Sequence, residues 1–389
     1  MPVARFLPLA GLLLAATATT AAHAQVDWEY TALADSSAEL ASFGVPALNN
    51  AGQVAFVATF DDPDEGQALY RYDGPGVLTV IATTDGAVTG FVGRPAINAA
   101  GLVAVAATLD NGSTSVLVGG SGGLVTVANT QTSGLTSLDA NPFISDAGVV
   151  AVRGVRASDG ARVILTGTGA AAPAVLLAST GLYDPLRVAG INDDGMVVFD
   201  ATTSAGAAGV YTTADGSTVT TVTETGPGGP VQQQRALDLD NNGAVTWLVR
   251  DDLGIDRLYT NASGGPVQFA NTAGAFDTFG DVSVAESAAV AFRAQLDLGL
   301  NAIFAGSTRV YEQATAVGDR LDGFAITALD IGSQAVTNTG AFTFRASRVN
   351  DTSGIYLAVP VLAGDGGGSA VDPFTGILLL VVAAGRRRC

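Results

Sequence analysis

The chain reads Leu48-Asn49-Asn50-Ala51-Gly52-Gln53-Val54-Ala55-Phe56 near its start, and six later segments repeat this phrase. An Asn three residues before a Gly is typical of a type I turn. The short polar side chain caps the turn, and Gly takes a backbone conformation that a Cβ disfavours. Large apolar residues follow at the second and fourth positions after Gly, and this period of two indicates a β-strand. The phrase therefore predicts a tight turn that leads into a strand.

The other six copies keep this pattern at residues 97–105, 144–152, 191–199, 239–247, 284–292 and 336–344. The 288 residues from Gly52 to Gly340 hold six intervals, so one repeat is 48 residues long. The turn residues that we expect to be structural are Asn49, Gly52, Asn98, Gly101, Gly148, Asn192, Gly195, Asp240, Gly243, Asn338 and Gly340. The sixth copy has Ala288 in place of Gly, so we expect its hairpin to be the most irregular.

Each repeat continues with two further strand patterns, such as residues 68–72 and 78–82 in the first repeat. Small residues such as Ala55 and Ala104 separate the large ones in the strand after the turn, which predicts that this strand is covered on both faces. A four-stranded meander of this length is the expected blade of a β-propeller. The sequence therefore predicts an all-β, seven-bladed propeller of antiparallel blades.

The last repeat has its turn and a third strand at residues 354–358, but no fourth strand. The segment at residues 28–35 has the pattern of that missing strand. We expect it to join the last blade and close the ring, because closure removes an exposed sheet edge. The alternative is an open β-solenoid, which would not need strands from both ends of the chain.

Residues 1–24 have the pattern of a secretory signal peptide. Arg5 is followed by an apolar run at residues 7–16, and Ala22 and Ala24 form an A-x-A cleavage site. We therefore expect the protein to be exported and the propeller to occupy residues 25–362.

The C-terminal residues predict a second sorting signal. A Gly-rich linker at residues 363–373 contains the expected processing residues Gly366, Gly367, Gly368 and Ser369. Residues 374–389 hold an apolar run followed by three Arg, and the run is shorter than the ~20 residues of a comfortable membrane span. Arg side chains favour the cytoplasmic side. We expect a transient anchor in the inner membrane, with a permanent short anchor as the alternative.

Composition excludes several kinds of chemistry. The net charge is −18 and there is no Lys, which disfavours nucleic-acid binding. The only His is His23 and the only Cys is Cys389, and both lie in segments expected to be removed. His- or Cys-based catalysis, His-ligated metals and disulfides are therefore not expected. We predict no catalytic, cofactor-binding or metal-binding residues.

Three weaker patterns have structural explanations. Residues 238–243 resemble the opening of a calcium loop, but Val249 stands where its bidentate acid belongs. Residues 61–66 carry four acids, which we interpret as a solvated turn rather than a cation site. Most Tyr residues occupy corresponding strand positions, which favours packing over sugar stacking.

The repeat resembles that of the choice-of-anchor tandem repeat proteins, which are named for an NxxGxxAF motif. Residues 49–56 match this motif in full, and residues 98–105 and 192–199 are close matches. The C-terminal layout is similar to the GlyGly-CTERM class of bacterial sorting signals. These resemblances imply an exported surface protein that is cut by signal peptidase and by a rhomboid-type sorting protease, but they imply no activity.

Repetition without a unique polar constellation favours a non-catalytic binding module, with a surface glycan or a protein as ligand on a loop face or in the central channel. One alternative is a carbohydrate-active hydrolase or lyase that uses Asp, Glu, Tyr and Arg in the channel. Another is a structural surface-layer component. An ordered trio of channel carboxylates would favour the enzyme.

Overall fold

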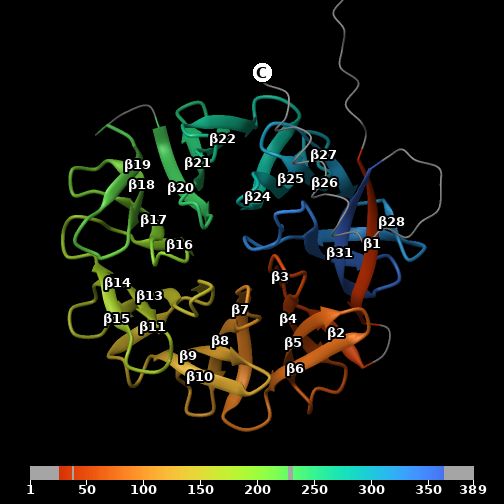
Figure 1. The fold of residues 1–389 in the computed structure, drawn as a ribbon, viewed down its shortest axis with the longest axis horizontal. Helices are drawn as coiled ribbons and strands as arrows, with labels where there is room; N and C mark the ends of the chain where they lie inside the picture. The colour runs from red at the N-terminus through yellow and green to blue at the C-terminus, as the bar shows by residue number, and fades with distance from the viewer. Residues whose placement is uncertain (1–25, 37–38, 227–230, 363–389) are drawn as a thin grey trace, which may run out of the picture.

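Seven antiparallel sheets surround a central axis in the computed structural model, which describes residues 26–36, 39–226 and 231–362 (Figure 1). No helix occurs in these described ranges. The sheets follow one another around the ring in chain order, so each is one blade of a seven-bladed β-propeller. The expected fold is confirmed, and the open solenoid is wrong because the ring closes.

The first three blades are built from residues 40–178. Blade 1 contains β2 (Leu40–Phe43), β3 (Ala47–Leu48), β4 (Val54–Phe60), β5 (Gln67–Gly74) and β6 (Val77–Thr83). Blade 2 contains β7 (Val88–Ile97), β8 (Val103–Leu109), β9 (Thr114–Gly120) and β10 (Gly123–Asn129). Blade 3 contains β11 (Leu135–Leu138), β12 (Phe143–Ile144), β13 (Val150–Arg156), β14 (Arg162–Gly167) and β15 (Ala174–Ala178).

Four further blades complete the ring. Blade 4 contains β16 (Arg187–Ile191), β17 (Val197–Thr202), β18 (Ala208–Thr213) and β19 (Thr220–Glu224). Blade 5 contains β20 (Val231–Leu239), β21 (Val245–Asp251), β22 (Asp256–Thr260) and β23 (Val267–Asn271). Blade 6 contains β24 (Phe276–Val284), β25 (Ala289–Leu296), β26 (Asn301–Ser307) and β27 (Tyr311–Ala316). Blade 7 contains β28 (Arg320–Leu321), β29 (Phe324–Asp330), β30 (Phe342–Arg348), β31 (Ser353–Leu362) and β1 (Val26–Asp35).

The extra strands do not change the four-stranded plan. In blades 1 and 3 the innermost strand is interrupted, so that β2 and β3 both pair with β4, and β11 and β12 both pair with β13. In blade 7 the two-residue β28 adds a small hairpin to β29. Every blade therefore retains four strand positions, from the channel outwards.

The recurring turn has the predicted geometry in all seven blades. In the first, the Gly52 N–H donates to the Asn49 carbonyl at 3.0 Å, and the backbone angle φ of Gly52 is +80°. The expectation of an irregular sixth hairpin is wrong, because the Ala288 N–H makes the same bond to the Ala285 carbonyl at 2.8 Å. Ala288 adopts a φ of +62° to do so. The replacement of Gly by Ala288 therefore leaves the turn unchanged and strains the backbone of this one residue.

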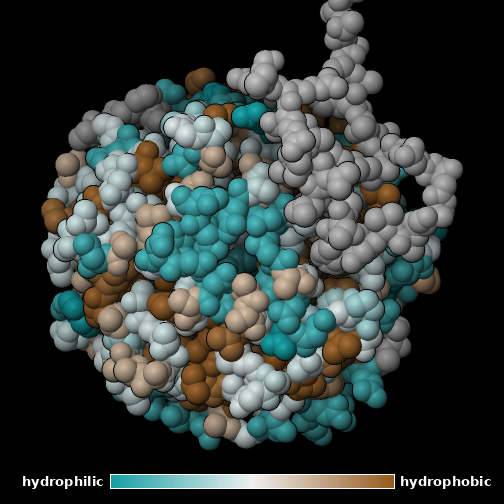
Figure 2. All heavy atoms as spheres, in the orientation of Figure 1, coloured by the Kyte–Doolittle hydropathy of each residue, from teal (hydrophilic) through white to brown (hydrophobic). Residues whose placement is uncertain are grey.

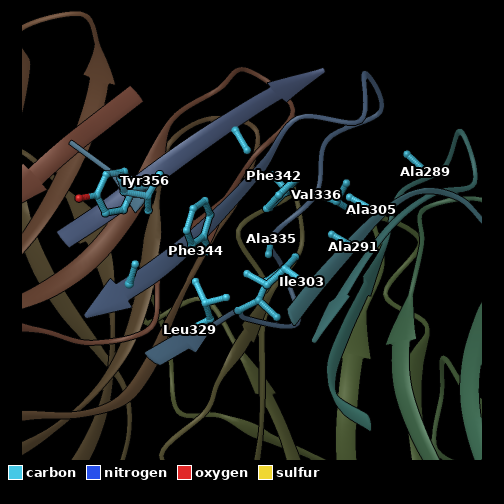
Figure 3. Close-up of a cluster of buried hydrophobic side chains, with 14 of the residues drawn as sticks. Ala289, Ala291, Ile303, Ala305, Leu329, Ala335, Val336, Phe342, Phe344 and Tyr356 are labelled. Carbon is cyan, nitrogen blue, oxygen red and sulfur yellow. The ribbon is translucent and has the colours of Figure 1, made fainter. Parts of the chain in front are cut away.

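The core consists of seven apolar clusters, one between each pair of neighbouring blades. Figure 3 shows the cluster between blades 6 and 7, where Phe342, Phe344 and Tyr356 lie near Ile303 and Leu329. Strands such as β4 are buried on both faces because each face meets a neighbouring blade, as predicted. Burial of this apolar surface is the main favourable term in folding.

An aromatic pair recurs within five of the blades, where the second and third strand positions face each other. The ring centroids lie 5.5–5.7 Å apart in the pairs Phe56–Tyr70, Phe199–Tyr211, Trp247–Tyr259, Phe292–Phe304 and Phe344–Tyr356. This arrangement confirms that the Tyr side chains at these positions are packing residues.

The ring is closed by β1, which pairs antiparallel with β31 (Figure 1). Residues 28–35 lie alongside residues 354–358, as the sequence predicted, and the register places Tyr30 opposite Ala358 and Asp35 opposite Gly354. Trp28 packs against Phe342 with ring centroids 5.0 Å apart, and the Tyr30 hydroxyl donates to the Ala314 carbonyl of blade 6 at 2.5 Å. The first strand of the chain therefore ties the last blade to its neighbour.

Several predictions lie outside the described residues. These are the signal peptide at residues 1–24 with Ala22 and Ala24, the linker at residues 363–373 with Gly366, Gly367, Gly368 and Ser369, and the apolar, Arg-rich segment at residues 374–389. Within the described ranges, the structure contains no helix of a length and apolarity that would cross a bilayer.

Candidate functional site: the two ends of the central channel

The innermost strands enclose a channel with a cavity at each end. One cavity, of about 120 Å³, is ringed by the repeat turns. The other, of about 270 Å³, is lined by residues that precede those turns on the same strands. Ser333 and Gln334 line both cavities, which places the two in line along one channel. In Figure 2, hydrophilic residues surround a hollow at the centre of the visible face.

In five of the seven turns the side chain of the first residue caps the turn. Asn49, Asn98, Asn192 and Asp240 each accept the N–H of the fourth following residue at 2.7–2.9 Å. Asn49 and Asn98 also donate from Nδ2 to a backbone carbonyl of the next blade. In the seventh turn the first position belongs to Thr337, since Gly340 donates to its carbonyl, so Asn338 lies one position later than the capping residues.

The second residue of each turn connects neighbouring blades. Asp146 accepts the Ala99 N–H at 2.6 Å, and Asp193 accepts the Asp146 N–H at 2.6 Å. Asn50 accepts the Asn338 N–H at 2.8 Å, which links the first and last repeats. The turn end is therefore a ring of hydrogen bonds between blades.

Three carboxylates from separate turns, Asp146, Asp193 and Glu286, lie around this end. Burial raises the pKa of Asp193 above its usual range, and the nearby charges of Asp146 and Glu286 raise it further. No group of three acidic side chains in the described part of the chain is arranged to hold a metal ion.

Asp238, the first acid of the calcium-loop pattern, has a structural environment. Its carboxyl oxygens accept the N–H groups of Leu239 and, from blade 6, Val284 at 2.8 and 2.7 Å. Burial raises the pKa of Asp238 to about 7, with a further contribution from Asp240. Asp240 is the turn cap, so neither acid is left as a free ligand.

The other end of the channel is lined by three arginines: Arg94 from β7, Arg187 from β16 and Arg235 from β20. Arg187 and Arg235 occupy the same repeat position, four residues before the last residue of their strands. The corresponding residues of the other five blades are Gly44, Gly93, Ala140, Gly280 and Gly332. Two adjacent blades therefore place long cationic side chains where the remaining blades have little or no side chain.

Two of the three arginines are paired. Arg187 forms an ion pair with Asp200 of its own blade and donates to the Ala236 carbonyl of blade 5 at 3.0 Å. Arg94 of blade 2 pairs with Asp281 of blade 6 at 2.7 Å. These two blades are not neighbours in the ring, so this ion pair spans the channel.

The Arg235 side chain makes no hydrogen bond or ion pair with any described residue. Desolvation lowers the pKa of its guanidinium, and the nearby charge of Arg187 lowers it further, while Asp200, Asp281 and Asp256 act in the opposite direction. A partly buried cation without a partner is uncommon, since buried charges normally pair. Arg235 is thus the arginine of this cavity whose guanidinium has no ion-pair partner and can donate to a ligand.

The side of the cavity that faces Arg187 and Arg235 carries three proline rings beside polar side chains. Blades 1, 2 and 3 contribute Pro46, Pro95 and Pro142, which share one repeat position, and Phe143 lies beside them. In a ring of seven blades, blade 1 lies opposite blades 4 and 5. The cavity therefore combines Arg187 and Arg235 on one side with prolines, Arg94, Asp139 and Asn141 on the other, and such a mixture of apolar and polar groups suits small organic ligands.

These arginines were not predicted from the sequence. When the seven repeats are aligned, five carry Gly or Ala at the position of Arg187 and Arg235, and only these two carry a long side chain there. A second repeat position, five residues after the turn Gly or Ala288, carries Arg153, Arg293 and Arg345. Arg153 and Arg345 donate to the Leu186 and Phe43 carbonyls of the next blade, and Arg293 pairs with Asp330 of the next blade at 3.8 Å. These three arginines connect neighbouring blades.

Residues 29–246 match a family described as a family of unknown function (DUF7453). No match was found among curated proteins. Among solved structures, the β-propeller domain of the trilobed protease from Pyrococcus furiosus is 11% identical, with 87% of this chain and 98% of that chain covered and a TM-score of 0.53. That domain has an open velcro topology, whereas here β1 pairs with β31.

A second similar structure is prolyl oligopeptidase B from Galerina marginata, bound to a macrocyclization substrate. It is 10% identical, with 79% of this chain and 47% of that chain covered and a TM-score of 0.52. At these identities both likenesses show the propeller fold alone.

Proposed function

The chain belongs to a family of unknown function (DUF7453), so membership supplies no activity, and we propose that the protein is a non-catalytic binding module whose ligand occupies the arginine-lined end of the central channel. The observation that carries this proposal is Arg235, a cation on the wall of a cavity of about 270 Å³ that has no partner among the described residues.

The repeat itself supports a functional role for this position. All seven blades build the same fold, and five of them do so with Gly or Ala at the position of Arg187 and Arg235. The fold therefore does not require Arg there. A desolvated guanidinium with unmade hydrogen bonds costs stability, and a ligand that accepts those bonds would offset that cost.

The acids at this end support binding rather than acid–base chemistry. Each of the three, Asp139, Asp200 and Asp281, forms an ion pair with an arginine, at 2.7 Å or less for the first and last of them. Hydrolysis of glycosides needs two carboxyls with different protonation states on opposite sides of the substrate. Burial raises the pKa of Asp200 despite its ion pair with Arg187, but all three carboxylates are engaged by arginine donors, which leaves no second, free carboxyl for such a pair.

The test is a binding screen of the purified full chain against glycans and small organic anions, with Arg235→Gln as the variant. We expect at least one ligand to bind and the variant to lose most of that affinity. The matched control is Arg309→Gln, because Arg309 is exposed between β26 and β27 on the outer part of blade 6. Ligands whose affinity is unchanged by Arg235→Gln would contradict the proposed site.

A second candidate is the carbohydrate-active hydrolase or lyase, which the trio of Asp146, Asp193 and Glu286 at the turn end favours. Burial and the nearby charges of Asp146 and Glu286 raise the pKa of Asp193, which is the direction that favours a general acid. Turnover of a polysaccharide panel that is abolished by Asp193→Asn would establish this candidate. Absence of turnover across the panel, together with channel binding, would favour the binding module.

We also propose that the protein is exported and displayed on the cell surface. The A-x-A pattern at Ala22 and Ala24 and the Gly-rich, apolar and Arg-rich tail support this proposal, as does the resemblance to choice-of-anchor proteins. Mass spectrometry of the native protein should find an N-terminus at Gln25 and a C-terminus near Gly366–Ser369. Intact ends would contradict processing.

A further inference from the structure

We infer that the arginine-lined cavity selects a ligand with a single negative charge, a carboxylate carried on one compact carbon ring such as that of a uronic acid. This inference rests on the proposed function and names the class of ligand for the same site. It is carried by the charge balance, the donor geometry and the proline rings that line the cavity.

The formal charges of the cavity leave one positive charge unpaired. Arg94, Arg187 and Arg235 line it together with Asp139 and Asp281, while Arg153 and Asp200 pair with lining residues. Four arginines against three aspartates give a balance of +1. A ligand with one negative charge would complete this balance, whereas a dianion would leave a negative charge without a partner.

The unpaired charge belongs to a guanidinium, and this group favours a carboxylate. A guanidinium presents a planar fork of N–H donors that matches two oxygens at once. The Arg187 guanidinium donates hydrogen bonds to Asp200 and to the Ala236 carbonyl, and these bonds fix its orientation beside Arg235. The free donors of Arg235 are therefore the place for the charged group of the ligand.

The residues opposite Arg187 and Arg235 indicate which kind of group the carboxylate of the ligand is attached to. Pro46, Pro95 and Pro142 are buried and line the cavity there. Such rings pack against the apolar C–H faces of a sugar or another saturated ring. A cavity of about 270 Å³ lies just below the range of ordinary ligand sites, about 300–1,000 Å³, and suits a single ring rather than a chain of them.

The experiment measures binding of D-glucuronate to the full chain by calorimetry, with D-glucuronamide as a ligand of the same shape without the charge. Inorganic phosphate serves as a non-carboxylate anion. We expect glucuronate to bind about tenfold or more tightly than glucuronamide and than phosphate, because a charge-assisted pair to Arg235 is lost in the amide.

Two variants change the charge of the cavity in opposite directions and should therefore change the affinity for glucuronate in opposite directions. Arg235→Gln should weaken glucuronate binding about tenfold or more and leave glucuronamide binding unchanged. Asp281→Asn frees Arg94 and raises the balance to +2, so it should strengthen glucuronate binding. Arg309→Gln should change neither ligand.

The outcomes separate this inference from the proposed function. Equal affinity for glucuronate and glucuronamide, tighter binding of phosphate, or weakening by Asp281→Asn would overturn the ligand class but leave a channel binding site. No binding of glucuronate would also overturn the ligand class. If no ligand of the wider glycan and anion screen depends on Arg235, the proposed function itself is wrong.

Discussion

Ala288 occupies a backbone conformation that the other six turns reserve for Gly, with φ of +62°. The left-handed region costs a residue with a Cβ about 1–2 kcal/mol. Ala288→Gly should relieve this strain, while the freer unfolded chain offsets about 0.4–1 kcal/mol of the gain. We expect a net stabilisation of up to about 1 kcal/mol, measured as the free energy of unfolding in urea.

Gly195→Ala is the matched reverse change. Gly195 has φ of +75°, and a Cβ placed there would meet no atom within 4 Å, so backbone strain is the dominant cost. It should destabilise by up to about 1 kcal/mol. If Ala288→Gly lowers stability, the strain argument fails.

Asp238 links pH to stability, because its pKa is raised to about 7 in the folded protein and an unfolded Asp titrates near about 3.9. The folded state binds the proton more tightly, so the contribution of Asp238 is fully present below about pH 4 and is lost as pH rises to about 7. Asp238→Asn removes this titration. It also turns an amide group towards one of the two backbone donors, Leu239 or Val284.

The variant should therefore be less stable than the natural protein near about pH 4, and the difference should shrink as the pH rises to about 8. Free energies of unfolding across this range check the prediction. Asp194→Asn, at an exposed position of another repeat turn, serves as the control. A difference between Asp238→Asn and the natural protein that does not vary with pH would rule out the raised pKa.

At the scale of the element, the side chains of the turn hairpins stabilise their own turns and also bond to the neighbouring blade. Asn49 accepts the Ala51 and Gln53 N–H groups and donates to the Asn98 carbonyl of blade 2 at 2.8 Å. Asn49→Ala leaves these buried groups without partners, and we expect a loss of about 2–4 kcal/mol in unfolding free energy.

Asn49→Ser separates the two roles of this side chain. The Ser145 hydroxyl caps the equivalent turn of blade 3, so Ser should restore the cap without the donor to blade 2 and cost less than Ala. Asn50→Ala should cost about 1 kcal/mol or less, since Asn50 is exposed and accepts a single N–H, from Asn338. Equal losses for the Ala and Ser variants of Asn49 would show that the cap does not contribute.

The same elements explain what the sequence could predict. The turn and its strand could be predicted from the sequence because capping by Asn49 and the left-handed conformation of Gly52 are local effects, and the pattern recurs in seven copies. The pair of Arg94 and Asp281 was not readable, because 187 residues separate its partners and only ring closure brings them together. Arg235 stands out only when it is compared with the Gly and Ala residues at the same position of the other blades. This comparison requires an alignment of the first strands.

At the scale of the whole molecule, stability depends on β1. This strand pairs with β31 from Val26 to Asp35, and Trp28 and Tyr30 cover Phe342 and Phe344 in the cluster of Figure 3. A chain that starts after Asp35 would expose this cluster and leave β31 as an open sheet edge. Removal of one large buried aromatic side chain costs about 3–5 kcal/mol, so the loss of β1 should exceed about 5 kcal/mol.

We expect the shortened chain to unfold at a clearly lower temperature and to self-associate through β31, as followed by thermal unfolding and size-exclusion chromatography. A synthetic peptide of residues 26–35 should restore both properties in trans, because the register of β1 on β31 places Trp28 and Tyr30 over the same cluster. The same peptide with Trp28 and Tyr30 replaced by Ala keeps the backbone pairing and should restore much less. An unchanged unfolding temperature without β1 would mean that blade 7 is stable with three strands, and the ring would then not depend on closure by the N-terminal strand.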